Sequence, residues 1–205
     1  IRRRFDYEIR EINLGGGFGI RYTDELRKPL SYFTDPLMDR IEGHYQALGL
    51  ERPAVVIEPG RSLVGEAGIT LYTVGNIKDI EGVRKYVSVD GGMTDNIRPA
   101  LSQADYTGVI ANKVGEEMED KVTICGKCCE SGDILIRDIG IPNPESGDIF
   151  CVFSTGAYGY SMASNYNMNP IPAVVFVENG KDTLVVRRQT YKDMLRNDIV
   201  PSWLE

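Results

Sequence analysis

A thiol and a carboxylate stand side by side at Cys129 and Glu130, in the turn-rich run Gly126-Lys127-Cys128-Cys129-Glu130-Ser131-Gly132-Asp133. A thiol is mostly protonated near neutral pH, so Cys129 could donate a proton to a reacting group. The plain alternative is a surface cysteine of no consequence. Because glycines and polar residues surround the pair, the run predicts an active-site edge rather than a core strand.

Two candidate phosphate-binding loops lie upstream, Asn13-Leu14-Gly15-Gly16-Gly17-Phe18-Gly19 and Glu58-Pro59-Gly60-Arg61. Each follows an apolar run that predicts a strand, 8–14 and 54–57 respectively. A glycine-rich loop after a strand can turn several backbone N–H groups toward a phosphate, and an arginine adds a fixed positive charge. Either loop alone could be an ordinary surface turn. Together they predict a site for a phosphorylated cofactor.

The segment between these strands predicts a helix that begins with Asp35 as its cap and Pro36 in its first turn. Apolar residues recur at helical spacing until Gly49 ends the pattern. Strand, loop, helix and strand form a parallel α/β unit with a right-handed crossover. Both strands should therefore end on the same side, so that the two loops face one crevice.

After about Gly68 the pattern changes to short β-rich runs separated by turns. The predicted strands are 69–77, 86–89, 121–124, 134–136 and 149–153. The clearest hairpin joins 173–177 to 183–186, because Asn179-Gly180 suits the positive φ angles of a tight turn. A brief helix is expected over 191–199. We predict two domains, an α/β part over residues 1–67 and an antiparallel all-β part over residues 68–205.

Composition narrows the possible functions. Thirty acidic against 23 basic residues give a net charge of -7, which opposes nonspecific binding to nucleic acid or anionic membranes. No apolar run approaches the ~20 residues that span a bilayer. Three of the four cysteines crowd at Cys125, Cys128 and Cys129, which is not the spacing of a disulfide framework and favours a reducing compartment. We expect a cytoplasmic protein.

Several cofactors fit the motifs poorly. The glycines lack the dinucleotide fingerprint with its acidic residue about 20 positions further on, and no Gly-Lys-Ser/Thr ending of a nucleotide P-loop is present. Cys125, Cys128 and Cys129 could seed a zinc module, but His44, the lone histidine, lies far away in sequence and a second ligand pair is missing. We predict no metal site.

Two further side chains could contact a small ligand. Tyr158, in Thr155-Gly156-Ala157-Tyr158-Gly159, follows a strong apolar strand and could present its ring at a domain boundary. Arg98, in Asn96-Ile97-Arg98-Pro99, lies in an irregular segment suited to gripping a carboxylate. Each also has an ordinary explanation, as a turn aromatic and as a surface ion pair.

Taken in order, these motifs, together with Asp90-Gly91-Gly92-Met93 and the Ala100-Leu101 that follows Pro99, strongly resemble the diaminopimelate decarboxylase family. The resemblance covers nearly the whole chain but only the family's C-terminal half. It implies the last strands of a (β/α)8 barrel that binds pyridoxal 5'-phosphate, followed by a β-domain. It further implies decarboxylation of meso-diaminopimelate to L-lysine and carbon dioxide.

The resemblance also implies roles for matched residues. Gly15, Gly16, Gly17, Gly60 and Arg61 would bind the cofactor's phosphate, and Glu58 would meet its pyridinium nitrogen. Arg61 and Arg98 would hold the retained substrate carboxylate. Cys129 would protonate the substrate carbon, Glu130 would bind the distal amino group, and Tyr158 would touch cofactor and substrate. In the family's homodimers the cysteine loop reaches into the partner's site.

Two departures qualify this resemblance. Ser102 stands where the family usually has a tyrosine, and the lysine that anchors the cofactor belongs to the N-terminal barrel half, which this chain lacks. Lys113 falls in the β-domain and is not a candidate anchor. The segment alone is therefore expected to be inactive. Alternatives are an ornithine or arginine decarboxylase of the same fold, disfavoured by Glu130, or a noncatalytic homologue that binds a decarboxylase subunit.

Overall fold

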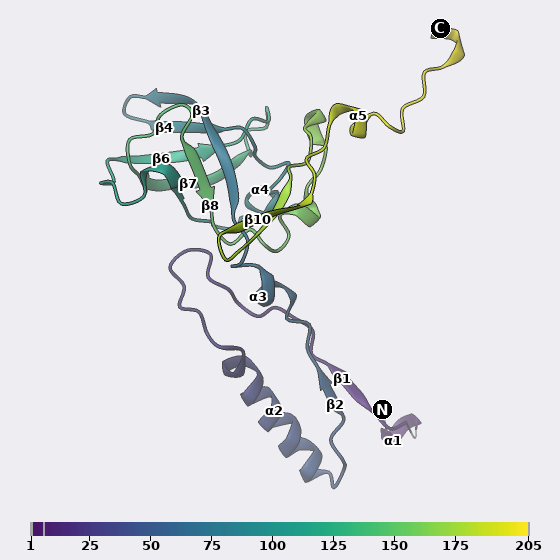
Figure 1. Ribbon diagram of the computed structural model, residues 1–205. Helices are drawn as coiled ribbons and strands as arrows, with labels where there is room; N and C mark the ends of the chain where they lie inside the picture. Colours follow the sequence, from purple (N-terminus) through teal and green to yellow (C-terminus); the bar gives the residue numbers. More distant parts are fainter. Residues whose placement is uncertain (1, 6, 205) are drawn as a thin grey trace.

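The computed structural model describes residues 2–5 and 7–204 (Figure 1). Its first part contains a short helix α1 (Arg2–Phe5), strand β1 (Glu11–Asn13), the long helix α2 (Leu30–Ala47), strand β2 (Ala54–Val56) and helix α3 (Gly60–Val64). This part forms the lower body in Figure 1, and α3 leads from it into the sheet above.

Strands β1 and β2 pair in parallel, with Glu11 opposite Ala54 and Asn13 opposite Val56. The pairing continues beyond the strands, because the Glu58 N–H donates to the Gly15 carbonyl at 2.8 Å. Both strands therefore end at the same edge, with the two glycine-containing loops side by side. The predicted parallel α/β unit is confirmed.

Helix α2 begins at Leu30, so the prediction that Asp35 caps it is wrong. The Asp35 carboxylate instead accepts a hydrogen bond from Thr34 inside the helix. Pro36 lies in the helix interior, where its missing N–H removes one backbone hydrogen bond without ending the helix. The helix ends as predicted, since Gly49 follows it with a positive φ of 63°.

The second part is a six-stranded sheet with strand order β5-β8-β3-β4-β6-β7. Its strands are β3 (Thr70–Ile80), β4 (Arg84–Val89), β5 (Gly108–Ile110), β6 (Asp120–Cys125), β7 (Ile134–Ile141) and β8 (Ile149–Val152). Adjacent strands are antiparallel except β4 and β6, which pair in parallel. The expected all-β part is thus mixed at one pair, and β5 was not predicted.

Apolar residues of this sheet form the core. Val87, Val122, Ile124, Phe150 and Val152 are at most 1% exposed. Helix α4 (Arg98–Ser102) follows β4, and short 3-10 helices η1 (Ala111–Lys113), η2 (Tyr160–Met162) and η3 (Tyr166–Met168) lie in the loops. No residue of α2, by contrast, is buried.

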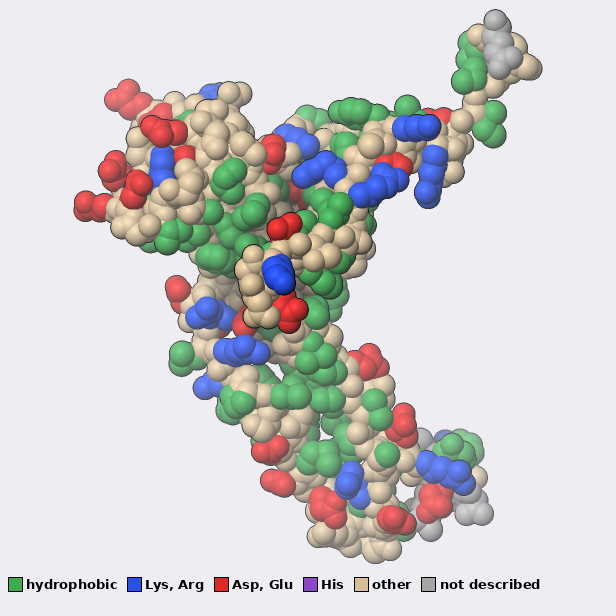
Figure 2. All heavy atoms as spheres, viewed as in Figure 1, with side chains coloured by type: hydrophobic (Ala, Val, Ile, Leu, Met, Phe, Trp, Pro, Cys, Tyr) green, Lys and Arg blue, Asp and Glu red, His purple; other side chains and the backbone are tan. Residues whose placement is uncertain are grey.

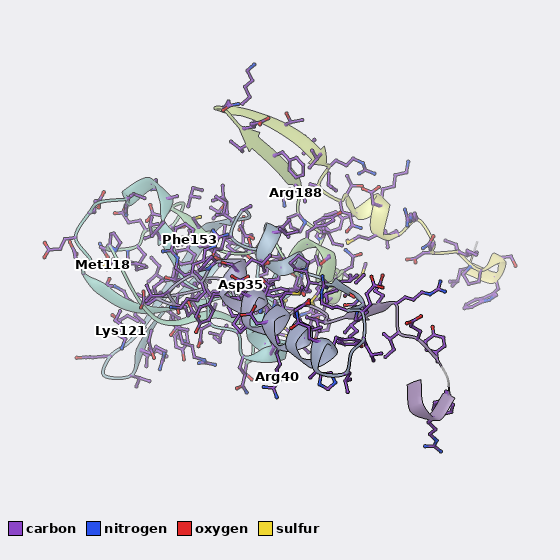
Figure 3. The ribbon with its side chains drawn as sticks, turned by 90° about the horizontal axis from the view of Figure 1, so that it is seen from below. Asp35, Arg40, Met118, Lys121, Phe153 and Arg188 are labelled. Atoms are coloured by element: carbon purple, nitrogen blue, oxygen red, sulfur yellow. The ribbon has the colours of Figure 1, made fainter. Side chains whose placement is uncertain are left out.

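The C-terminal region is a separate hairpin of β9 (Val174–Glu178) and β10 (Lys181–Val186). Asn179 and Gly180 have φ angles of 51° and 74°, so the predicted tight turn is confirmed. The hairpin projects from the body when the molecule is seen from below (Figure 3). The expected helix over 191–199 is only one turn, α5 (Tyr191–Met194), and η4 (Ser202–Leu204) ends the described chain.

Two glycines allow the α/β part and the sheet to meet. A Cβ atom on Gly156 would lie 1.9 Å from the Val64 carbonyl oxygen, and one on Gly68 would lie 2.3 Å from the Gly156 Cα. The Gly156 N–H donates to the Gly65 carbonyl at 3.0 Å. The segment after β8 therefore packs directly against the end of α3.

We predict that Gly156→Ala lowers the free energy of unfolding by about 1–3 kcal/mol, because the added methyl group must displace backbone. Gly140→Ala, in β7, is the matched control, since its Cβ would meet only the Met118 sulfur, at 3.4 Å. Urea denaturation followed by circular dichroism measures both. Equal stability of the two variants would contradict the prediction.

Candidate cofactor and substrate site

The two loops predicted to face one crevice do line a common cavity of about 380 Å³. Its lining residues are Gly16, Gly17, Phe18, Glu58, Pro59, Arg61, Ser62 and Tyr158. Gly15 and Gly60 are not among these residues, but they lie next to them in the two loops. Of the predicted cofactor-binding residues, the cavity thus brings together Gly16, Gly17, Glu58, Arg61 and Tyr158, the last from the sheet part.

The glycine loop has a shape that other residues would not permit. Gly15 and Gly17 have positive φ angles of 72° and 86°. A Cβ atom on Gly16 would lie 2.5 Å from the Glu58 carbonyl oxygen. The loops are therefore in direct backbone contact, and the glycine backbone lies open to the cavity.

Asn13 holds both loops from the end of β1. Its Nδ2 donates to Glu58 Oε1 at 2.6 Å, and its Oδ1 accepts from the Gly15 N–H at 2.7 Å. The Glu58 carboxylate is thereby fixed at the cavity wall. A fixed carboxylate can hold a protonated ring nitrogen, so this position suits the role that the resemblance implies.

Arg61 and Arg98 approach the same aromatic ring from different parts of the chain. The guanidinium carbons of Arg61 and Arg98 lie 5.9 Å and 5.2 Å from the Tyr22 ring centroid, and Arg98 also donates to the Tyr22 hydroxyl. Arg98 lies 5.4 Å from the Tyr158 ring centroid as well. Two fixed cations are thus held close to the cavity, where they favour an anionic ligand.

Tyr22 was not predicted from the sequence. It packs edge-on against the buried Tyr106, with ring centroids 5.1 Å apart. The chain contains 11 tyrosines, and no spacing distinguishes Tyr22 from the others. Tyr158, which was predicted, has a positive φ of 64°, an uncommon conformation that is typical of functional sites.

Cys129 and Glu130 lie together in a second polar cluster. The Cys129 thiol donates to Glu130 Oε1 at 3.6 Å, and the Tyr166 hydroxyl donates to the same oxygen. Asn167 Nδ2 donates to Glu130 Oε2 at 3.4 Å and to Cys129 Sγ at 3.8 Å. Tyr166 and Asn167 were also missed, although the alternating Asn165-Tyr166-Asn167-Met168-Asn169 run signals an irregular turn.

Hydrogen bonding shifts the ionisation of this cluster. The Tyr166 hydroxyl lowers the pKa of Glu130, and the Glu130 carboxylate raises the pKa of Tyr166 to about 12. Burial, with the nearby Asp133, raises the pKa of Cys128 to about 11. Glu130 is therefore ionised at neutral pH while the Tyr166 hydroxyl and the Cys128 thiol keep their protons.

Asp133 links the loop that carries Cys128 and Cys129 to the segment that follows β4. Its buried carboxylate accepts from the Met93 N–H at 2.7 Å and from the Cys128 N–H at 2.8 Å. The Lys127 N–H donates to the Gly91 carbonyl at 2.9 Å. The Asp90-Gly91-Gly92-Met93 motif therefore supports the loop that carries Cys129.

The cysteine cluster and the cavity are distinct in this chain. Neither Cys129 nor Glu130 belongs to the cavity lining. The segment after Tyr158 connects them along the chain, since it continues directly to Tyr166 and Asn167. The cavity and the thiol are therefore not brought together within the described part of this chain.

The remaining candidate residues have other partners. Lys113 forms an ion pair with the buried Asp148 at 2.9 Å, and the Cys125 thiol donates to the Val87 carbonyl at 3.6 Å. The Ser102 hydroxyl donates to the Arg98 carbonyl at 3.0 Å. Within residues 2–5 and 7–204, no three histidine, cysteine, aspartate or glutamate side chains gather as a metal site. No helix among these residues is long and apolar enough to cross a membrane.

The donor set of the cavity fits pyridoxal phosphate. Open glycine backbone and the Arg61 guanidinium suit a phosphate, and the fixed Glu58 carboxylate suits a protonated pyridine nitrogen. Gly16 passes so close to Glu58 that a side chain there would disturb both groups.

Comparisons with known proteins identify the family of this chain. Residues 21–156 match the family model described as "Pyridoxal-dependent decarboxylase, C-terminal sheet domain". The chain is 54% identical over 200 residues to the diaminopimelate decarboxylase of Bacillus subtilis (strain 168), covering 97% of this chain and 45% of that protein. It is 49% identical over 199 residues to the diaminopimelate decarboxylase of Halalkalibacterium halodurans, again covering 97% and 45%.

A solved structure of a diaminopimelate decarboxylase has a similar fold. The crystal structure of diaminopimelate decarboxylase from M. jannaschii in co-complex with L-lysine superimposes with a TM-score of 0.90 at 38% identity, covering all of this chain and 46% of that one. The chain thus spans less than half the length of the relatives it matches. The family match covers most of the chain and includes Arg61, Arg98, Cys129 and Glu130. The chain therefore belongs to the pyridoxal-dependent decarboxylase family, and it carries that family's C-terminal sheet domain.

Proposed function

We propose that this chain is the C-terminal portion of a diaminopimelate decarboxylase, which converts meso-2,6-diaminopimelate to L-lysine and carbon dioxide with pyridoxal 5'-phosphate. The observation that carries the proposal is the cavity in which the glycine loop, Glu58, Arg61 and Tyr158 converge. The identity of about half with curated diaminopimelate decarboxylases supports the choice of substrate. We further propose a boundary between the barrel and sheet domains near residues 67 and 68.

Within this proposal the cavity binds the cofactor. The open backbone of Gly15, Gly16, Gly17 and Gly60 and the charge of Arg61 hold the phosphate. Glu58, fixed by Asn13, holds the proton on the pyridine nitrogen. When bound, pyridoxal phosphate accepts the electron pair that remains as carbon dioxide departs. Tyr158 contacts cofactor and substrate from the sheet side.

The other residues act on the substrate. Arg61 and Arg98, aligned by Tyr22, bind the carboxylate that is retained. Glu130, kept ionised by Tyr166, binds the distal ammonium group. The Cys129 thiol delivers a proton to the carbon that has lost carbon dioxide.

We propose that the active unit is a cytoplasmic homodimer with shared sites. The separation of Cys129 from the cavity within one chain supports this, because the loop of a second copy could supply the thiol. The N-terminal barrel half would supply the cofactor's lysine. The lower body carries exposed apolar residues, including Tyr32, Leu37 and Leu63. Apolar side chains on this surface (Figure 2) support docking of the N-terminal barrel half against the lower body.

Two alternatives remain distinct from this proposal. A decarboxylase of the same fold acting on ornithine or arginine removes the single carboxylate of its substrate, so Arg61 and Arg98 would have no retained carboxylate to bind. A noncatalytic homologue would bind a decarboxylase subunit without forming lysine. Product analysis with diaminopimelate, ornithine and arginine separates all three.

We expect coexpression with the N-terminal half of a close relative to restore lysine formation and cofactor binding, because that half supplies the missing anchor lysine and barrel strands. Lysine release is measured by chromatography and cofactor retention by absorbance. The chain without its complement is the control and should be inactive. A folded, paired assembly that forms no lysine would exclude the proposal.

Cys129→Ala in this assembly should slow lysine formation by about a hundredfold or more, because it removes the proposed proton donor. Cofactor binding should be unchanged. Cys151→Ala serves as the control, since Cys151 is buried in β8 and lies outside the cavity lining. An unchanged turnover in Cys129→Ala would rule out the thiol as the donor.

Arg61→Gln should raise the dissociation constant for pyridoxal phosphate by about tenfold, because a charge-assisted hydrogen bond to phosphate is lost. Equilibrium titration of the cofactor into the cofactor-free assembly measures this. Arg40→Gln is the matched control, as Arg40 is an exposed residue of α2 (Figure 3). The same affinity in both variants would show that Arg61 does not contact the phosphate.

A further inference from the structure

The half-buried Glu130 carboxylate accepts hydrogen bonds from three neighbouring side chains. Tyr166 and the Cys129 thiol donate to one oxygen, and Asn167 donates to the other. An ionised carboxylate has about four acceptor sites. Three protein donors therefore fix the carboxylate in place and still leave an acceptor site for one more donor, such as an ammonium group.

The turn that supplies these donors is held in an uncommon backbone conformation. Asn167 and Met168 have φ angles of 53° and 55°, two successive non-glycine residues in the left-handed region. Such strain persists only where surrounding contacts enforce it, and it is concentrated at functional sites. Asparagine tolerates this conformation better than most residues and also carries the amide that contacts Glu130.

Hydrogen bonds on both sides of the turn hold it in place. Asn165 Nδ2 donates to the Asn169 carbonyl at 2.8 Å and to Gln189 Oε1 at 2.6 Å. Asn169 Nδ2 donates to the Tyr166 carbonyl at 3.0 Å. Upstream, the Ser164 N–H donates to the Thr94 carbonyl at 2.9 Å. The donors that meet Glu130 are thus presented by a fixed turn rather than by free side chains.

We propose that Tyr166 and Asn167 are positioning residues that orient the Glu130 carboxylate to bind the distal ammonium group of a diamino acid. The inference rests on the proposed function. Both residues act through Glu130. Tyr166 and Asn167 therefore determine how strongly the site prefers a diamino acid over an amino acid of the same length without the distal amine.

The test measures equilibrium binding of two ligands to the reconstituted, cofactor-loaded assembly by calorimetry. L-lysine carries the distal ammonium group as its α-ammonium, because the carbon that loses carbon dioxide becomes its ε-carbon. 6-Aminohexanoate has the same carbon chain, carboxylate and ε-amine but lacks that α-ammonium group. Tyr166→Phe should raise the dissociation constant for L-lysine by about tenfold, because the carboxylate loses a charge-assisted hydrogen bond and its fixed orientation. Binding of 6-aminohexanoate should change by less than about twofold.

Two further variants separate positioning from a structural role. Asn167→Gly keeps a residue that tolerates positive φ but removes the side-chain amide. It should therefore also weaken the binding of L-lysine while leaving the binding of the second ligand nearly unchanged. Tyr160→Phe removes a hydroxyl from the same segment without touching Glu130, and should bind both ligands as the unaltered protein does. Among the described residues, no hydrogen bond involves the Tyr160 hydroxyl.

A double-mutant cycle identifies the residue through which Tyr166 acts. Glu130→Gln should weaken L-lysine binding, and adding Tyr166→Phe to it should produce no further loss. Additive losses, an equal loss for both ligands, or unchanged L-lysine binding in Tyr166→Phe and Asn167→Gly would each overturn the inference.

The outcome is distinguishable from failure of the proposed function. If the unaltered assembly forms lysine and Glu130→Gln selectively weakens L-lysine, the proposed function holds whatever Tyr166 does. If the unaltered assembly neither forms nor binds lysine, the proposed function fails first, and with it the inference that rests on it.

Discussion

The parallel pairing of β1 with β2 is the constraint on which the candidate site depends. Each strand is only three residues long, yet the pairing continues into the loops through the hydrogen bond from the Glu58 N–H to the Gly15 carbonyl. Because parallel strands end at one edge, the glycine loop and Arg61 share a cavity. Asn13 adds side-chain hydrogen bonds to both loops, so the cavity wall is fixed from both strands.

A second constraint is the close approach of Gly156 to the end of α3. The absence of side chains at Gly68 and Gly156 lets the segment after β8 lie against the α/β part. Tyr158 follows two residues later and therefore reaches the cavity and Arg98. The site consequently combines anion-binding groups from one part of the chain with an aromatic ring from the other.

The cysteine cluster is held in place by hydrogen bonds to two carboxylates, those of Asp133 and Glu130. Its position depends on the buried Asp133, which accepts backbone hydrogen bonds from two loops, while Glu130 is oriented by side chains of the Tyr166 turn. A buried carboxylate needs such partners, because an unpaired charge away from water is costly. The cluster is thus well ordered within one chain although it lies outside the cavity that it is proposed to serve.

Local sequence patterns determined much of the fold. Apolar runs predicted β1, β2 and most strands of the sheet, and Asn179-Gly180 predicted the β9–β10 hairpin, because periodicity and turn chemistry depend on neighbouring residues. The start of α2 was misplaced, since Asp35 and Pro36 carry strong start signals that a continuing helix can override. The parallel pairing of β4 with β6 was also missed, because the pairing of strands distant in sequence produces no recognisable pattern in either strand's own residues.

The same division applies to the site. The sequence by itself determined which residues could bind a phosphate, a carboxylate or an amine, because Gly16, Arg61, Cys129 and Glu130 stand in recognisable motifs. Only the tertiary structure decided that Tyr22 lies against both arginines, that the Tyr166 turn meets Glu130, and that the thiol stays apart from the cavity. Those contacts join residues far apart in the chain, and their geometry is set by how the strands and loops pack.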